Sequence, residues 1–132
     1  MGNSNKTILI VEDEKDLLES YKELIGMGGY SVATAIDGYH GLDYLANNIG
    51  HVDLVLLDLM MPGVDGLEVL RAIKADKEKY GDMPIIVLTN MSSELVIKEA
   101  FDLGASSYLV KSDLDYDGLL KELNKYLGSS DK

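Results

Sequence analysis

The sequence predicts an α/β protein built on an open parallel sheet. Short apolar runs alternate with longer amphipathic stretches, which is the pattern of successive strand–helix units. Three of the short runs are almost entirely apolar, as strands covered on both faces should be. With 132 residues the chain suits one domain of about five such units, and a second domain would not fit.

The five expected strands are the short apolar runs of this pattern. They are TILIV at 7–11, SVATA at 31–35, VDLVLL at 52–57, PIIVL at 84–88 and SYLV at 107–110.

The intervening stretches place apolar side chains three and four residues apart, which predicts helices with one buried side each. The sets are Leu17, Leu18, Tyr21, Leu24 and Ile25; Leu42, Leu45, Ala46 and Ile49; Leu67, Leu70 and Ile73; Val96, Ala100 and Leu103; and Leu119, Leu120, Leu123 and Leu127. Near the expected helix starts lie acids that can accept a first-turn N–H: Asp13, Asp37 and Asp65.

Charge and composition exclude several classes of function. The 23 acidic residues outnumber the 12 Lys and Arg, and the net charge of -11 repels phosphate backbones and anionic lipid surfaces. Direct binding to nucleic acid or membrane is therefore not expected. The chain has no Cys, and neither the opening MGNSNK nor any other segment resembles a secretory or membrane-spanning sequence. We expect a cytoplasmic protein.

Polar side chains follow four of the five expected strands directly. Glu12 and Asp13 come after the first strand, Asp58 after the third, Thr89 after the fourth and Lys111 after the fifth. Ligands of open parallel sheets bind outside the carboxyl ends of the strands, so these positions predict a site.

Asp58 is the least ordinary of these residues. Helix capping would explain Asp13 taken alone, but Asp58 is followed by LMMPGVD, with a Pro-Gly turn, before the next helix begins. A lone carboxylate among apolar neighbours would cost several kcal/mol or become protonated. A compensating positive charge is therefore expected beside Asp58.

Three carboxylates in one crevice, without His or Cys, suit a hard divalent cation, and Mg2+ is the natural candidate. Lys111 would add a second positive charge. A metal ion and an ammonium group on either side of one carboxylate, with the Thr89 hydroxyl nearby, would neutralise an incoming phosphoryl group.

From Lys6 to Leu127 the sequence resembles the receiver domain of bacterial and archaeal two-component response regulators. The resemblance rests on ILIVEDE, LVLLDLMMPGVDG, PIIVLTN and GASSYLVK, in this order. It implies a flavodoxin-like, doubly wound sheet of order 2-1-3-4-5. It also implies a phosphorelay, in which a sensor histidine kinase or a histidine phosphotransfer protein is the partner that phosphorylates the chain.

By this resemblance Asp58 is the phosphoacceptor and a Mg2+ ligand. Asp13 would bind the ion directly, as would the backbone carbonyl of Met60, while Glu12 would act through water. Lys111 would pair with the phosphoryl oxygens.

The resemblance also implies a conformational switch. Thr89 would donate its hydroxyl to the phosphoryl group, Tyr108 would turn inward, and the surface of the fourth helix, fifth strand and fifth helix would change. Taken alone, Thr89 could be an ordinary strand-end hydroxyl, and Tyr108 a core aromatic whose hydroxyl reaches water.

The acidic pair is Glu12 with Asp13 rather than two aspartates, which is a common variant of the family, and two further positions depart from the family pattern. Asn90 replaces the usual small residue after the Thr, where its amide would either crowd access to Asp58 or hydrogen-bond the phosphoryl group. Ser112 replaces the usual Pro after the Lys, so a trans bond and a differently shaped loop are expected there.

The expected organisation is a receiver domain at 6–127 with flexible termini at 1–5 and 128–132. No output segment follows Leu127, so the chain is either a single-domain regulator or a receiver cut from a larger protein, with an unknown downstream target. Two other functions stay open: a Mg2+-dependent phosphohydrolase, which would need a second acid where Met60 stands, and a receiver-like binding module that is never phosphorylated. We expect a switch that acts only on itself, not a turnover enzyme.

Overall fold

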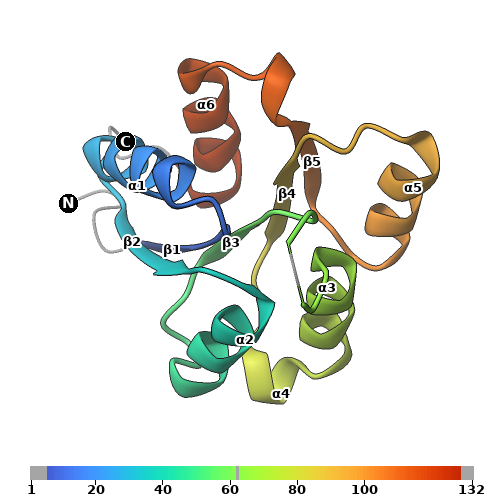
Figure 1. Cartoon of the computed structure of the whole chain (residues 1–132). Helices are drawn as coiled ribbons and strands as arrows, with labels where there is room; N and C mark the ends of the chain where they lie inside the picture. Colours follow the sequence, from blue (N-terminus) through green and yellow to red (C-terminus); the bar gives the residue numbers. More distant parts are fainter. Residues whose placement is uncertain (1–5, 62, 129–132) are drawn as a thin grey trace.

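The computed structural model describes residues 6–61 and 63–128 and contains one parallel sheet. Its strands are β1 (Thr7–Val11), β2 (Ser31–Ala35), β3 (Leu54–Leu57), β4 (Ile85–Thr89) and β5 (Ser107–Val110). All four pairings are parallel, and the order is β2-β1-β3-β4-β5. The predicted doubly wound fold, with strand order 2-1-3-4-5, is confirmed (Figure 1).

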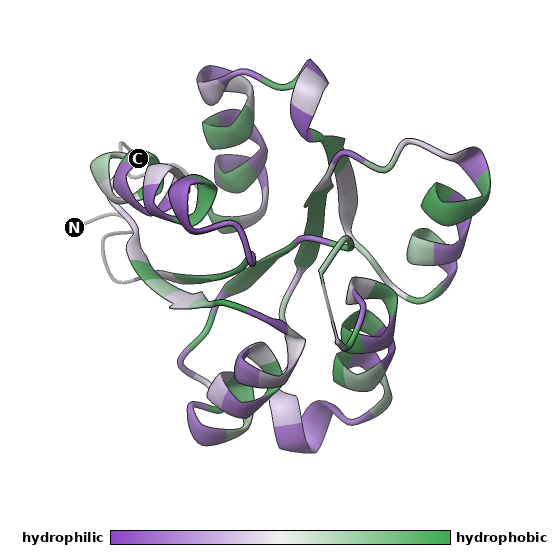
Figure 2. Cartoon of the chain, in the orientation of Figure 1, coloured by the Kyte–Doolittle hydropathy of each residue, from purple (hydrophilic) through white to green (hydrophobic). Residues whose placement is uncertain are grey.

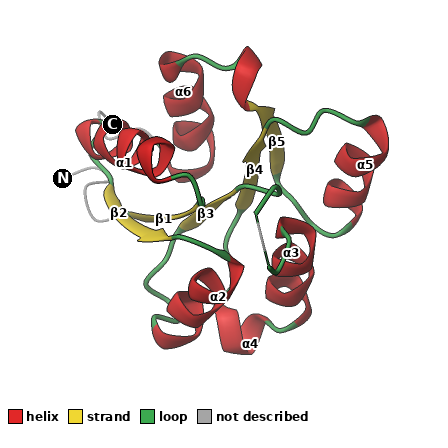
Figure 3. Ribbon diagram, viewed as in Figure 1, coloured by secondary structure: helices red, strands yellow, loops and turns green. Residues whose placement is uncertain are grey.

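Helices cover both faces of this sheet (Figure 3). They are α1 (Lys15–Met27), α2 (Gly38–Asn47), α3 (Gly66–Ala75), α4 (Lys77–Tyr80), α5 (Glu94–Asp102) and α6 (Tyr116–Leu127), with a 3-10 turn, η1 (Lys111–Asp113). α1 and α6 enclose one core with one face of the sheet, and α2, α3 and α5 enclose the other. The fourth and fifth helices expected from the sequence are therefore α5 and α6.

The central strands form the middle of both cores. Every residue of β3 and β4 is buried, because these strands have a neighbour on each side and helices above and below. Alternate residues of β3 serve opposite cores: Val55 and Leu57 face α2 and α3, whereas Leu54 and Leu56 face α1 and α6. Figure 2 shows the hydrophobic colour concentrated on these inner strands, and both colours on the helices around them.

Two of the three predicted caps are present. The side chain of Asp37 accepts the His40 N–H at the start of α2, and that of Asp65 accepts the Glu68 N–H at the start of α3. Capping by Asp13 is wrong, because α1 begins at Lys15 and its N-cap residue is Glu14. Helix capping therefore does not account for Asp13.

Other differences from the expected elements are small. β3 begins at Leu54 rather than at residue 52, and Thr89 belongs to β4. α4 is an additional single turn, with Asp76 accepting the Lys79 N–H. Ile49 is 48% exposed, contrary to its predicted place in a buried stripe, because α2 ends at Asn47.

Some expectations fall on residues that the structure does not describe. These are Pro62 in the turn after Asp58, and the termini at 1–5 and 128–132 apart from Gly128.

Candidate functional site

Parallel pairing brings the carboxyl ends of four strands to one edge of the sheet. Val11 pairs with Leu57 in the β1–β3 register, so Glu12 and Asp58 follow at the same level. Across the sheet, Thr89 pairs with Val110, which directly precedes Lys111. The polar residues predicted from the strand ends therefore meet in space, although they span most of the chain.

The three acids form one cluster. Glu12, Asp13 and Asp58 each offer a carboxylate oxygen, and these oxygens all lie within 4.8 Å of one another. Glu12 is 2% exposed and Asp58 5% exposed, while Asp13 lies at the surface. An all-oxygen set with one open side suits a hard cation such as Mg2+ that keeps part of its water shell.

Local backbone groups orient the two buried carboxylates. The Glu14 N–H donates to Glu12 Oε2 at 3.0 Å, and the Met60 N–H donates to Asp58 Oδ1 at 3.2 Å. Sequence reasoning did not find these two donors, because backbone N–H groups carry no residue-specific signal. The two N–H donors lie in the loops that follow β1 and β3. Each of these loops therefore carries one of the buried carboxylates and also orients it.

Lys111 joins the two buried acids. Its Nζ donates to Glu12 Oε1 at 2.8 Å and to Asp58 Oδ2 at 3.4 Å, and its side chain is 11% exposed. Burial raises the pKa of Glu12, and the charge of Asp58 adds to that rise, while the Lys111 hydrogen bond opposes it. Burial alone would lower the pKa of Lys111, but the Glu12 hydrogen bond and the charge of Asp58 outweigh it and raise that pKa. Lys111 therefore stays charged beside the acids.

Thr89 and Tyr108 contact the same residue of the β4–α5 loop. Thr89 is fully buried, and its Oγ1 accepts the Met91 N–H at 3.4 Å. The Tyr108 hydroxyl donates to the Met91 carbonyl at 2.6 Å. Burial raises the pKa of Tyr108, with a smaller contribution from the charge of Asp58. Met91 thus connects the two side chains, so a movement of the Thr89 hydroxyl can be passed to Tyr108 through it.

Asn90 and Ser112 contact each other. The Ser112 N–H donates to Asn90 Oδ1 at 3.0 Å, a contact that sequence reasoning missed. The bond between Lys111 and Ser112 is trans, as are all peptide bonds of the described residues. Both positions that depart from the family pattern therefore belong to one structural feature.

A cleft lies over these residues. Asp13, Glu14, Asp58, Met60, Asn90 and Lys111 line it. Met60, whose backbone carbonyl was expected to bind the metal ion, is exposed at this cleft.

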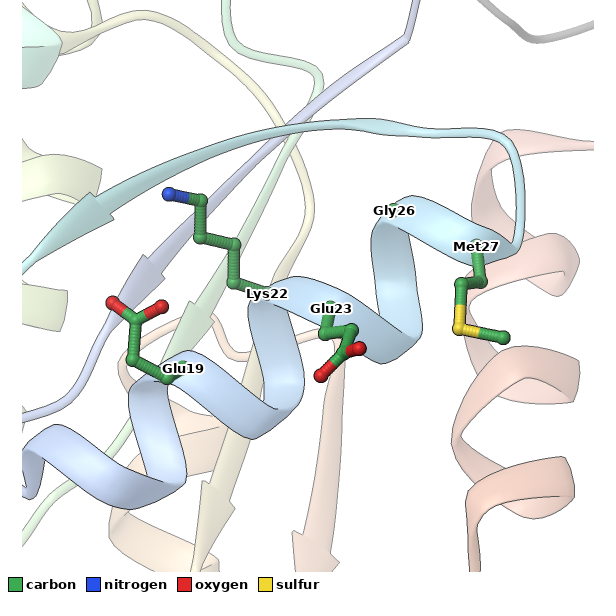
Figure 4. Close-up of a pocket in the computed structure, with 5 residues that line it drawn as sticks. All are labelled: Glu19, Lys22, Glu23, Gly26 and Met27. Atoms are coloured by element: carbon green, nitrogen blue, oxygen red, sulfur yellow. The ribbon is translucent and has the colours of Figure 1, made fainter.

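A second hollow lies along the exposed side of α1 (Figure 4). Its five lining residues are Glu19, Lys22, Glu23, Gly26 and Met27, and all of them are exposed. Over the described part of the chain, no helix combines the length and the apolar character needed to cross a bilayer.

Comparison with protein families gives a match over almost the whole chain. The model of the response regulator receiver domain matches residues 8–124. Among curated relatives, the response regulator MprA of Mycobacterium sp. (strain KMS) is 42% identical over 104 residues, which are 79% of this chain and 43% of MprA. The transcriptional regulatory protein CpxR of Escherichia coli (strain K12) is 40% identical over 79% of this chain and 42% of CpxR. The chain spans less than half the length of these relatives.

Solved structures of similar fold match this chain over nearly their whole length, unlike the longer curated relatives. A CheY-like receiver domain protein from Methanospirillum hungatei has a TM-score of 0.82 and 30% identity, covering 96% of both chains. The chemotaxis protein CheY4 of Vibrio cholerae has a TM-score of 0.82 and 29% identity, covering 92% of this chain and 98% of CheY4.

Proposed function

This chain belongs to the response regulator receiver domain family of two-component signalling, and from that premise we propose that it is a switch phosphorylated on Asp58. The observation that supports this most is the cluster of Glu12, Asp13 and Asp58, with Lys111 in contact with its two buried members, Glu12 and Asp58. The donor would be a histidine of a sensor kinase or of a phosphotransfer protein. The site is proposed to work in the cytoplasm.

The acid cluster fits Mg2+ by the chemistry of its donors. Asp13, Asp58 and the Met60 carbonyl would hold the ion directly, and Glu12 would hold it through a water molecule. Bound Mg2+ would neutralise charge on the phosphoryl oxygens during transfer. The raised pKa of the buried Glu12 favours this, because burial and the charge of Asp58 disfavour its charged form and a second cation would offset both effects.

Asp58 is proposed as the nucleophile. One of its carboxylate oxygens would attack phosphorus, the bond between phosphorus and the donor imidazole nitrogen would break, and the imidazole would leave with the electron pair and take up a proton. Lys111 would then pair with the phosphoryl oxygens, because its ammonium group already lies 3.4 Å from Asp58 Oδ2.

Thr89 and Tyr108 are proposed to convert this charge into a change of surface. If Thr89 donates its hydroxyl to the phosphoryl group, its oxygen would be drawn away from the Met91 N–H. The Met91 carbonyl accepts a hydrogen bond from the Tyr108 hydroxyl, so a shift of Thr89 would move the β4–α5 loop and Tyr108 together. The surface of α5, β5 and α6 would then bind a downstream target differently. We propose no direct contact with nucleic acid, in keeping with the net charge of -11.

Incubation with Mg2+ and acetyl phosphate tests this function. Intact-mass measurement should find one added phosphoryl group on the wild type and none on Asp58→Asn, which keeps the shape of the side chain but loses the nucleophile. Equal labelling of both proteins would refute Asp58 as the acceptor. Multiple turnover of a chromogenic phosphate ester would instead indicate a phosphohydrolase, and absence of labelling would indicate an unphosphorylated binding module.

A further inference from the structure

Asn90 lines the cleft over Asp58 and also makes a specific hydrogen bond to a neighbouring loop. Its amide lies at the cleft over Asp58, yet its Oδ1 is engaged by the backbone N–H of Ser112. We infer that Asn90 is a positioning residue for Lys111: it holds the peptide that follows Lys111, and so keeps the ammonium group at the phosphoryl site. This inference rests on the proposed function.

The hydrogen bond continues the sheet beyond its last backbone pair. In the β4–β5 register the last pair is Thr89 with Val110. The residue after Thr89 is Asn90, and its side chain accepts the N–H of Ser112, two residues beyond the end of β5. The hydrogen bonding between the two chain segments is thus continued by a side-chain acceptor, Asn90 Oδ1, beyond the last backbone pair.

The peptide group between Lys111 and Ser112 is hydrogen-bonded at both its carbonyl and its N–H. Its carbonyl accepts the Leu114 N–H at 3.3 Å within η1, and the next N–H along the chain, that of Ser112, donates to Asn90. The Lys111 side chain is long and has several rotatable bonds, so a fixed backbone limits where its Nζ can lie. That Nζ contacts both buried acids, at 2.8 and 3.4 Å.

This bond requires a residue other than Pro at position 112 and an acceptor side chain at position 90. A Pro at position 112 would have no N–H to donate, and a small apolar side chain at position 90 would have no acceptor. Because Asn90 directly follows Thr89, the same bond links the β4–α5 loop to the Lys111 backbone. The proposed movement of Thr89 would therefore act on Lys111 as well.

Crowding and positioning predict opposite results for Asn90→Ala. If the amide only obstructed Asp58, its removal would speed labelling by acetyl phosphate. If the amide positions Lys111, labelling should slow by about fivefold, the change that the loss of one hydrogen bond commonly produces.

The test measures labelling rates with Mg2+ and acetyl phosphate in Asn90→Ala, Ser112→Pro and the double variant. Each single variant should be slower by about fivefold, and the double variant should be no slower than either, because all three lack the same bond. Ser93→Ala, an exposed change in the same loop, should label at the wild-type rate.

Amide hydrogen exchange measures the bond itself. The amide at position 112 should exchange faster in Asn90→Ala than in wild type, while in Ser112→Ala, which keeps the N–H, it should stay as protected as in wild type. Three results would overturn this inference and leave the proposed function intact: faster labelling of Asn90→Ala, additive losses in the double variant, or normal labelling of Ser112→Pro. Absence of labelling in the wild type would overturn the proposed function, and this inference with it.

Discussion

Lys111 is the single residue on which the buried acids depend most. Replacing it by Ala leaves the Glu12 carboxylate, which is 2% exposed, without its nearest cation. We expect a loss of about 2 kcal/mol in the free energy of unfolding at neutral pH without Mg2+. The raised pKa of Lys111 means that its contribution is complete below the ordinary lysine pKa and is lost only as the pH rises through the raised value.

Urea unfolding of Lys111→Ala measures this loss. The matched control is Lys98→Ala, which breaks an exposed ion pair of the same 2.8 Å length with Asp102 and should leave the urea midpoint unchanged. Equal effects of the two substitutions would contradict a special role for burial at Lys111.

Asp13 is the exposed member of the acid cluster, and its contribution should be to the cation rather than to stability. Asp13→Ala should weaken Mg2+ binding by about tenfold or more, because fewer charged oxygens remain to displace water from the ion. Calorimetric titration with Mg2+ checks this. Asp16→Ala, which removes an exposed acid from the first turn of α1, should leave the affinity as it is.

At the scale of elements, Gly66 sets how closely α3 approaches the end of β3. A Cβ at this position would lie 2.5 Å from the Asp58 carbonyl oxygen and 2.5 Å from the Leu59 Cα, and neither backbone atom can move without shifting Asp58, the proposed phosphoacceptor. Gly66→Ala should therefore destabilise the protein by about 2 kcal/mol and slow labelling of Asp58.

Gly26→Ala is the matched control for Gly66→Ala. Gly26 lies within α1, where a Cβ meets no atom within 4 Å, so Ala should stabilise the protein by about 0.5 to 1 kcal/mol. Thermal unfolding of the two variants should change in opposite directions. A stable Gly66→Ala variant with normal labelling would refute the close approach.

The start of α2 should depend on pH through Asp37. Hydrogen bonds from the His40 N–H, and then from the His40 ring, lower the pKa of Asp37. A depressed pKa means that the cap stabilises the protein at pH values above the ordinary Asp pKa and is lost as the pH falls through the depressed value.

Asp37→Ala should therefore cost about 1 kcal/mol at neutral pH, and the difference from wild type should shrink in acid. Unfolding free energies measured at several pH values test this. A difference that grows as the pH falls would contradict the sign of the shift.

The elements differ in how far their sequences specify them. The apolar runs were sufficient to predict the five strands, whereas the order of the strands in the sheet followed only from the family resemblance. α4 was not predicted, because KEKY has no apolar periodicity and is a single turn capped by Asp76. Asp13 has the residue type of an N-cap, but the first turn starts one residue too late to use it.

At the scale of the whole molecule, the parallel sheet brings the candidate site together. Position in the sequence was enough to predict that Glu12, Asp58 and Lys111 would meet, because parallel strands end at one edge. Their individual pairings could not be predicted. The Lys111 contact with Glu12 and the Asn90 contact with Ser112 depend on rotamers and loop paths that only the packed structure fixes.

We propose that a cation-dependent phosphorylation takes place on one residue of this sheet edge. The most direct measurement treats the protein with acetyl phosphate, with and without Mg2+, traps the acyl phosphate by borohydride reduction, and maps the product by peptide mass spectrometry. We predict reduction product at Asp58 alone, and only when Mg2+ is present. Product at another carboxylate, or equal product after removal of Mg2+ with a chelator, would contradict the account.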